Sequence, residues 1–207
     1  VKTARGRKTS SKNWLQRQLN DPYAKKAQME GYRSRAAYKL IELDERFRFI
    51  KPGMRIVDLG SAPGGWLQVC VKKGVAEVIG IDLLPIDPID GATIFEKDFT
   101  EDDAPDMVKA AMGGPADGVI SDLAPWTTGH KNTDHVRIVG LVELAALFAF
   151  ETLKPGGFLI AKVFQGGAET ELLDQLKQRF GKVRHFKPAS SRSESAETFL
   201  IAMGFKG

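Results

Sequence analysis

The sequence contains little cysteine and histidine, and this shortage excludes several kinds of site. The single cysteine, Cys70, lies in an apolar stretch, so the chain has neither an internal disulfide nor a cysteine-based metal site. The histidines, His130, His135 and His185, lack the spacing of metal ligands, and we expect no metal. A lone cysteine is typical of reducing compartments, so we expect a cytoplasmic protein.

Long apolar runs are also missing. No stretch approaches the roughly 20 residues that a membrane span requires, and the start has no signal-peptide core. The chain has 207 residues, 43% of them hydrophobic, which is enough for one core and too few for two ordinary domains. Nothing in the composition indicates an obligate oligomer, so we expect a monomer that does not contact membranes.

Charge is distributed unevenly along the chain. Residues 1–51 carry 14 Lys and Arg against 5 Asp and Glu, whereas residues 52–207 carry 16 against 21. A second basic stretch, 177–193, contains no acidic residue. Aromatic residues lie among the first group of charges: Trp14, Tyr23, Tyr32 and Tyr38. Basic residues mixed with aromatics suit an RNA backbone with unstacked bases, although a solvated basic surface explains residues 1–12 equally well.

The chain divides into three segments. Residues 1–12 are predicted to be a disordered basic tail, and residues 13–207 a single domain. Its first part, 13–51, is a helical extension, with short helices at 11–19 and 21–30, capped by Ser11 and Asp21, and a longer helix from near Ser34. Its second part, 52–207, alternates strands and helices.

The predicted strands indicate an α/β fold. Runs such as VISDL and FLIAKVF are apolar throughout, which is typical of a mostly parallel sheet with helices on both faces. The last two strands are separated only by the loop PASSRSESA. Parallel pairing would require a crossover of a dozen residues or more. The final strand is therefore predicted to run antiparallel to its neighbours.

The run DLGSAPGGW, residues 58–66, joins a predicted strand to a predicted helix. Doubly wound sheets hold nucleotide-like ligands at such a turn. Gly60 allows a sharp turn, and Gly64 and Gly65 omit a Cβ where a ligand would lie. Ala62 occupies the place of the second glycine in the dinucleotide pattern G-x-G-x-x-G. The turn therefore favours a ligand without a pyrophosphate and disfavours a nicotinamide-dependent oxidoreductase.

Two acidic residues end the next two predicted strands. Asp82 follows Gly60 by 22 residues, which is the position of a carboxylate that accepts ribose hydroxyls. Asp98 ends the following strand and could accept from the exocyclic amine of adenine. A nucleoside without phosphates, held by two acids, indicates S-adenosylmethionine.

Longer motifs then resemble a known family. DLGSAPGGWLQ, IDLLPIDP, SDLAP, GGFLIAKVFQG and KPASSRSESAETFLIAMG are similar to those of the FtsJ/RrmJ family of ribose 2′-O-methyltransferases, almost end to end. The resemblance implies a class I S-adenosylmethionine-dependent methyltransferase, a Rossmann-like fold with a seven-stranded sheet. It implies these cofactor-binding residues: Gly60, Ala62, Pro63, Gly64, Gly65, Trp66, Asp82, Leu83, Asp98, Phe99 and Asp122. Trp66 would wall off the methionine side of the cofactor, or else simply pack at the start of a helix.

The resemblance also implies a catalytic tetrad of Lys39, Asp122, Lys162 and Glu197. Asp122 and Lys162 end predicted strands and Glu197 begins an antiparallel one, so these three should meet at one edge of the sheet. We hypothesise that Lys162 is the general base and Asp122 positions it near the methyl group, while Lys39 and Glu197 align the ribose. A lysine base needs a pKa well below about 10.4. Burial and a second ammonium lower it and carboxylates raise it, so the sequence leaves the sign open.

The resemblance favours one substrate among several. It implies methylation of a uridine in the A-loop of large-subunit ribosomal RNA, on the assembled large subunit. One alternative is a ribose in tRNA. Another, from a different class, is an RNA-binding ribosome-assembly factor with little catalysis, against which the filled tetrad argues. Ser191 and Ser193, in the last loop, would contact RNA phosphate or form only a polar turn.

Overall fold

The computed structural model describes residues 21–124, 131–164 and 170–207, with the backbone alone for residues 131–139 and 170. The predicted tail and the predicted helix at 11–19 lie outside these residues. The strands are β1 (Arg55–Leu59), β2 (Glu77–Asp82), β3 (Thr93–Glu96), β4 (Ala116–Ser121), β5 (Leu153–Phe164), β6 (Phe180–Phe186) and β7 (Glu197–Phe205). The helices are α2 (Pro22–Met29), α3 (Ala37–Phe47), α4 (Gly65–Lys72), α5 (Ala104–Ala111), α6 (Lys131–Thr152) and α7 (Thr170–Arg179).

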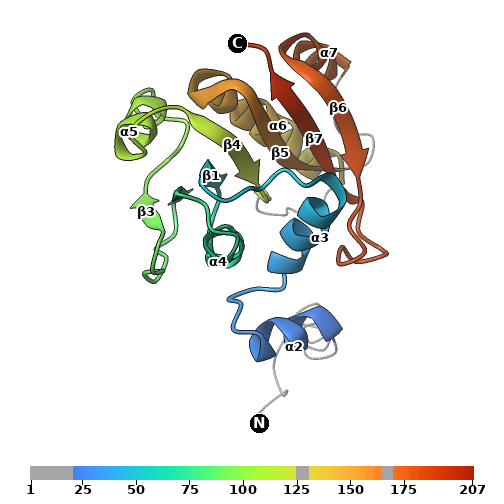
Figure 1. The fold of residues 1–207 in the computed structure, drawn as a ribbon. Coiled ribbons are helices and arrows are strands. Elements are labelled where there is room, and N and C mark those ends of the chain that lie inside the picture. The colour runs from blue at the N-terminus through green and yellow to red at the C-terminus, as the bar shows by residue number, and fades with distance from the viewer. Residues whose placement is uncertain (1–20, 125–130, 165–169) are drawn as a thin grey trace.

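The strands form one seven-stranded sheet in the order β3-β2-β1-β4-β5-β7-β6 (Figure 1). The first five strands of this order pair in parallel. β7 is antiparallel to both β5 and β6, which confirms the prediction made from the short loop before it. The start of β7 therefore lies at the edge of the sheet where β4 and β5 end.

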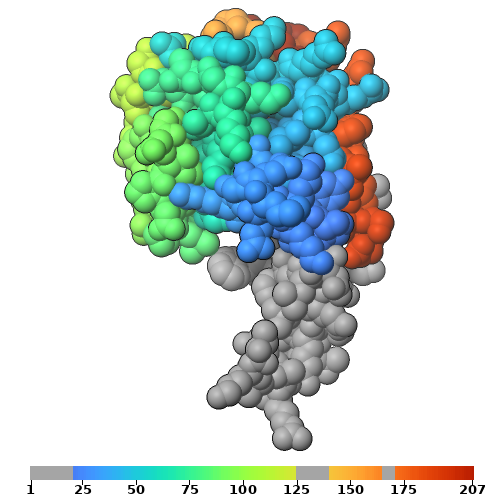
Figure 2. Space-filling view, turned by 60° about the horizontal axis from the view of Figure 1, so that its bottom comes forward, coloured from blue at the N-terminus to red at the C-terminus, as the bar shows by residue number. Residues whose placement is uncertain are grey.

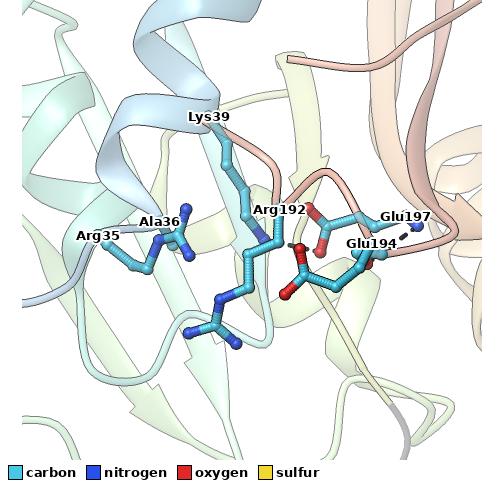
Figure 3. A pocket seen from close by; sticks show the side chains of 7 residues that line it. Arg35, Ala36, Lys39, Arg192, Glu194 and Glu197 are labelled. Atoms are coloured by element: carbon cyan, nitrogen blue, oxygen red, sulfur yellow. Dashed lines mark hydrogen bonds and ion pairs between the residues drawn. The ribbon is translucent and has the colours of Figure 1, made fainter. Parts of the chain in front are cut away.

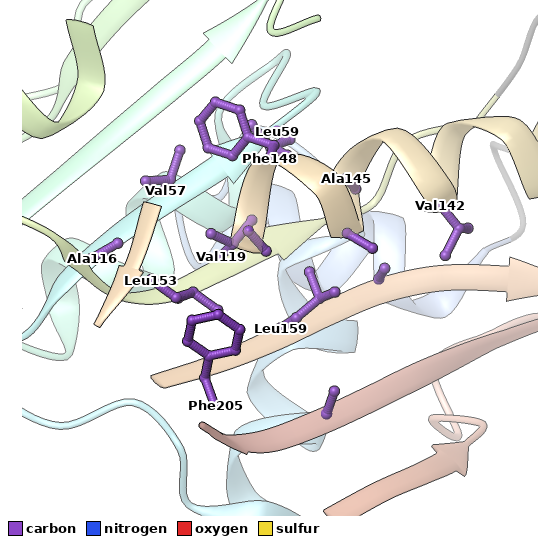
Figure 4. Packing of buried hydrophobic residues seen from close by; sticks show 14 of the residues in the cluster. Val57, Leu59, Ala116, Val119, Val142, Ala145, Phe148, Leu153, Leu159 and Phe205 are labelled. Carbon is purple, nitrogen blue, oxygen red and sulfur yellow. The ribbon is translucent and has the colours of Figure 1, made fainter. Parts of the chain in front are cut away.

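Helices cover both faces of the sheet, as the apolar strands predicted. α5, α6 and α7 pack on one face, where α6 contributes Val142, Ala145 and Phe148 to a core that includes strand residues such as Val119 and Leu159 (Figure 4). α3 and α4 pack on the other face, and Figure 1 shows α3 in front of the sheet and α6 behind it. No helix in the described ranges is long and apolar enough to cross a membrane.

The predicted cap of the first described helix is confirmed. The Asp21 carboxylate accepts from the backbone N–H groups of Tyr23 and Ala24, at 3.0 and 3.3 Å. These bonds satisfy donors that the first turn of a helix leaves free. Pro22 occupies the first helical position, where its missing N–H costs nothing.

The following helix starts at Ala37 and not near Ser34. Residues 34–36 form a tight turn, in which the N–H of Ala37 bonds to the carbonyl of Ser34 at 3.3 Å. The turn is held by Arg35, which bonds to the Asp21 carboxylate and to the carbonyl of Ser190. Figure 2 shows the blue surface of this N-terminal part against the orange-red surface near residues 180–195. Tertiary contacts therefore override the local preference for helix.

Candidate active site

The pleat of the sheet places a row of charged residues on the face that α3 and α4 cover. Successive strand residues point to opposite faces, so residues two apart share a face. Ile56, Ile120 and Ile160 are buried under α3 and α4. Two positions further along each chain, and on β2 beside them, lie charged residues: Asp82, Asp58, Asp122 and Lys162, in the order β2, β1, β4, β5.

Four of the predicted residues form a continuous ionic network. Lys39, from α3, places its Nζ 3.2 Å from both carboxylate oxygens of Asp122 and 2.9 Å from Oε2 of Glu197. Lys162 places its Nζ 3.1 Å from Oδ1 of Asp122 and 2.7 Å from the backbone oxygen of that residue. The four side chains are only 7–17% exposed. The structure thus brings together the whole tetrad that the sequence predicted; we call it the quartet.

The two lysines of the quartet differ in their bonding. Lys39 is directed at two different carboxylates, Asp122 and Glu197. Both contacts of Lys162 are to Asp122, one through the side chain and one through the backbone. An ammonium has three N–H donors. One position on Lys162 therefore has no hydrogen-bond partner in the part of the chain that the structure describes.

Electrostatics fixes the charge of two members. Burial alone would raise the pKa of Asp122, but the ammonium groups of Lys162 and Lys39 outweigh it and hold that pKa below its usual value. Burial alone would lower the pKa of Lys39, but the carboxylates of Asp122 and Glu197 outweigh it and raise that pKa. Lys39 is therefore a fixed cation near neutral pH and a poor candidate for a base.

The loop before β7 orients the Glu197 carboxylate. The buried hydroxyl of Ser191 donates to Oε1 of Glu197 at 2.7 Å, while Lys39 binds Oε2. Each carboxylate oxygen thus has its own donor. Ser193 is exposed and donates to Glu194 instead. For Ser191, the structure describes a contact with the quartet, whereas a contact of either serine with RNA stays a prediction.

A cavity of about 360 Å³ opens beside Lys39 and Glu197 (Figure 3). Arg35 and Arg192 border it, and both approach Oδ2 of Asp21, at 2.5 and 3.5 Å. The cavity therefore lies beside two members of the quartet and beside two arginines, Arg35 from the early part of the chain and Arg192 from its last part. Its lining residues are Arg35, Ala36, Lys39, Arg192, Glu194, Ser195 and Glu197.

The glycines of the DLGSAPGGW turn are packed closely against side chains of neighbouring residues. Gly60 has a φ of +74°, and a Cβ there would lie 2.2 Å from Cδ2 of Leu123. A Cβ on Gly64 would lie 2.6 Å from Cδ1 of Ile89, and one on Gly65 would lie 2.5 Å from Oγ of Ser34. Close packing is thus sufficient reason for these glycines, and their contact with a ligand stays a prediction.

The two predicted nucleoside acids organise loops. Asp82 accepts from the backbone N–H of Ala62 at 2.8 Å and of Leu84 at 2.9 Å, so it ties the glycine turn to the end of β2. The adjacent Leu83 and Leu84 are 68% and 52% exposed, which leaves an apolar surface beside the carboxylate. Asp98 accepts from the N–H and hydroxyl of Thr100.

Two predicted aromatic contacts have packing roles. The Trp66 side chain is 3% exposed, its indole N–H donates to the carbonyl of Ala36 at 2.8 Å, and its ring lies 5.9 Å from that of Phe199. The ring of Phe99 lies edge-on to that of Phe148 on α6. Their contact with a cofactor stays a prediction.

Sequence reasoning missed two residues near the turn. Arg33 donates to the carbonyls of Pro63, Asp87 and Pro88, and so clamps the turn against the loop after β2. It lay in a basic segment that we had assigned to RNA. Asp58 is 1% exposed, and its Oδ2 has no hydrogen-bond partner among the described residues. Burial, with the nearby charges of Asp122 and Asp82, raises its pKa well above the usual value. The signal in the sequence that could have indicated Asp58 is its place as the first residue of the DLGSAPGGW motif.

Comparisons with known sequences and structures match this chain to one family. The sequence profile of a family described as FtsJ-like methyltransferase matches residues 32–205. A protein of Maricaulis maris named ribosomal RNA large subunit methyltransferase E is 75% identical over 207 residues, which are 100% of this chain and 74% of that one. A protein of the same name from Granulibacter bethesdensis is 58% identical over 206 residues, covering 100% and 90% of the two chains. A crystal structure titled as a ribosomal RNA methyltransferase of Plasmodium falciparum has a TM-score of 0.75 and 32% identity, covering 85% of this chain and 100% of the other.

Proposed function

The chain belongs to the FtsJ-like methyltransferase family, and from this premise we propose that it transfers a methyl group from S-adenosylmethionine to a ribose 2′-hydroxyl of large-subunit ribosomal RNA. The names of relatives 75% and 58% identical to it support this substrate. The resemblance of the motifs supports the finer assignment, a uridine in the A-loop methylated on the assembled large subunit. We place this activity in the cytoplasm, with a monomeric enzyme.

The quartet is the observation that carries the proposal. A ribose hydroxyl is protonated at neutral pH, so a base must take its proton as the oxygen attacks. Lys162 can act as this base once its ammonium has lost one proton: the two remaining N–H groups bind Asp122, at 2.7 and 3.1 Å, and the lone pair of Nζ takes the proton of the 2′-hydroxyl. A positioned base of this kind contributes roughly 10²–10⁴-fold to a rate.

The other quartet members position the ribose. Lys39, a fixed cation, donates hydrogen bonds, and Glu197, fixed by Ser191, accepts them. Asp122 keeps two ammonium groups together without net repulsion, because its carboxylate binds both. The quartet thus aligns a nucleophile, and alignment supplies much of the rate in a displacement that needs in-line geometry.

The residues around the glycine turn fit the proposed cofactor. S-adenosylmethionine, when bound, supplies an electrophilic methyl group on a positively charged sulfonium. The carboxylates of Asp82 and Asp98 suit a cationic nucleoside and would repel a pyrophosphate. Oδ2 of Asp58 has no partner among the described residues, and exposed Leu83 offers an apolar surface to a base. We assign the cofactor to Gly60, Ala62, Pro63, Gly64, Gly65, Trp66, Asp82, Leu83, Asp98, Phe99 and Asp122.

Methyl transfer from labelled cofactor tests the proposal. The substrates are large subunits that lack the modification, deproteinised large-subunit rRNA, and bulk tRNA, with Lys162→Ala as the inactive comparison. Label in the subunit, at a ribose that resists alkaline cleavage, is the expected result. Label in tRNA alone would replace the substrate and keep the chemistry. No label in any RNA, with the cofactor bound, would overturn the enzymatic role and favour an assembly factor.

A further inference from the structure

A second groove lies at the C-terminal end of α3, whereas Lys39 of the quartet lies near the N-terminal end of that helix. Its volume is about 520 Å³, and it shares no lining residue with the cavity beside Lys39. We call it the β6 groove. Its lining residues are Arg46, Phe47, Gly181, Lys182, Arg184, Ile201, Met203 and Gly204. It therefore lies between the C-terminal end of α3 and the last two strands of the sheet.

Strand pairing explains how the groove forms. Lys182 pairs with Met203 and Arg184 pairs with Ile201, so these four side chains share a face. Ile201 belongs to the core cluster under α3, which identifies the face. β6 is the last strand of the sheet, so its outer side is not covered by another strand. Long basic side chains consequently border an apolar floor of Ile201 and Met203.

The groove concentrates positive charge without counter-charge. Three of its lining residues are cations and none is acidic. Arg46, Lys182 and Arg184 are all exposed, and none forms an ion pair with another described residue. Other lysines do form such pairs: half-buried Lys109 with Asp106, and exposed Lys154 with Asp117. Residues 52–207 carry more acidic than basic residues, so this concentration is local.

We propose that the β6 groove binds the phosphate backbone of the substrate RNA, outside the nucleotide that is methylated; this rests on the proposed function. Guanidinium and ammonium groups without carboxylate partners match phosphates, and each contact releases counterions. The Phe47 ring, held edge-on to Phe186 at 5.5 Å, and the apolar floor suit sugar and base surfaces. Arg46 follows Lys39 by seven residues, about 10 Å along a helix. One RNA could therefore occupy the quartet and the groove together.

Binding of RNA measured independently of catalysis tests the inference. The probe is a labelled large-subunit rRNA fragment that contains the A-loop, and its affinity is followed by fluorescence anisotropy between about 50 and 200 mM salt. The variant is Lys182→Glu with Arg184→Glu. The control is Lys109→Glu with Lys154→Glu, which changes the net charge equally and lies elsewhere.

If the groove binds RNA, the groove variant should raise the Kd for the fragment on the order of tenfold, and the control should stay within about twofold of wild type. The slope of log affinity against log salt concentration should fall in magnitude by about one to two in the groove variant. For methyl transfer it expects a raised KM and an unchanged kcat. If the Glu variant does not fold, Lys182→Gln with Arg184→Gln is used, with a smaller loss in the same direction.

Equal affinities of groove variant and control would overturn the inference, as would wild-type protein that does not bind the fragment. If Lys182→Val self-associated and bound the RNA fragment with unchanged affinity, the basic residues would instead serve to prevent β6, an edge strand, from pairing with another molecule. The two proposals fail separately. Groove-dependent binding without methyl transfer refutes only the proposed function, and methyl transfer with equal KM in both variants refutes only the groove.

Discussion

Asp58 lies in β1 and Asp122 directly follows the adjacent strand β4, and the pKa values of the two residues are shifted in opposite directions. Burial raises the pKa of Asp58, and no cation binds it among the described residues. Asp122 is also removed from most of the solvent, but two ammonium groups lie within 3.2 Å of its carboxylate and lower its pKa. Two aspartates at neighbouring strands therefore have oppositely shifted pKa values. Each shift predicts how the stability of the protein depends on pH.

Asp58→Asn is expected to gain stability relative to wild type as the pH rises. The folded pKa of Asp58 lies above its unfolded value of about 3.8, so its contribution is fully present below that pH and is lost as the pH rises through the folded pKa. Asparagine does not ionise, so the variant does not lose this stability as the pH rises.

Urea unfolding of the cofactor-free protein at several pH values between about 4 and 8 measures this effect. Asp90→Asn, at an exposed position, serves as the control for the substitution itself. If the difference in unfolding free energy between Asp58→Asn and wild type did not change with pH, ionisation of Asp58 would not destabilise the folded protein.

Asp122→Asn is expected to be less stable than wild type at neutral pH, and this difference is expected to shrink as the pH falls. Its folded pKa lies below its ordinary value of 3.8, so its contribution is present above that pH and is lost as the pH falls through the folded pKa. The variant leaves two buried ammonium groups without their shared anion, although the backbone oxygen still binds Lys162. We expect a loss of about 1–3 kcal/mol at neutral pH.

The same urea experiment at about pH 7 and about pH 3 tests this prediction. The stability gap between wild type and Asp122→Asn should narrow in acid, and Asp98→Asn, in a local turn, serves as the control for the substitution itself. A gap that widens in acid would contradict the assigned charge state.

Much of the fold and half of the quartet follow from local patterns. The length of the loop before β7 predicted its antiparallel direction, because nine residues are too few for a crossover. The charges of Asp122 and Lys162 could be found because each interrupts or ends an apolar strand. Lys39 and Glu197 could not be found in this way, since one reads as an ordinary charge on a helix and the other as an ordinary charge on an edge strand, and only the resemblance to the family indicated them.

The contacts that the sequence did not predict join distant segments. Arg35 bonds to Ser190, 155 positions away, and Arg33 bonds to Pro88, 55 positions away. No periodicity encodes such pairs, because an arginine on a turn has the same local signature whether it binds RNA, solvent or a carbonyl. The delayed start of α3 has the same origin, because Arg35 is drawn toward Asp21.

Asp21 combines two functions on separate oxygens, and substitutions can separate them. Oδ1 caps α2, while Oδ2 binds Arg35 at 2.5 Å and approaches Arg192 at 3.5 Å. Asp21→Ala removes both and is expected to cost about 3 kcal/mol of stability. Asp21→Asn retains an N-cap residue and is expected to cost about half as much. Urea unfolding measures both, and equal losses would mean that the cap contributes nothing.

Lys162→Met is the sharpest test of the proposed base, because β5 also supplies its control. Methionine keeps an unbranched side chain and removes the ammonium, so we expect kcat to fall roughly 10²–10⁴-fold while the cofactor binds within about threefold of wild type. Lys154→Met, on the same strand, removes an ammonium that is bound to Asp117 far from the quartet, and it should leave kcat unchanged. Single-turnover methyl transfer and calorimetric cofactor binding give the two quantities. Activity above a tenth of wild type in Lys162→Met would mean that the base lies elsewhere. A joint loss of activity and cofactor affinity would mean that Lys162 acts by supporting the cofactor site, because a base that only takes a proton from the ribose has no effect on cofactor binding.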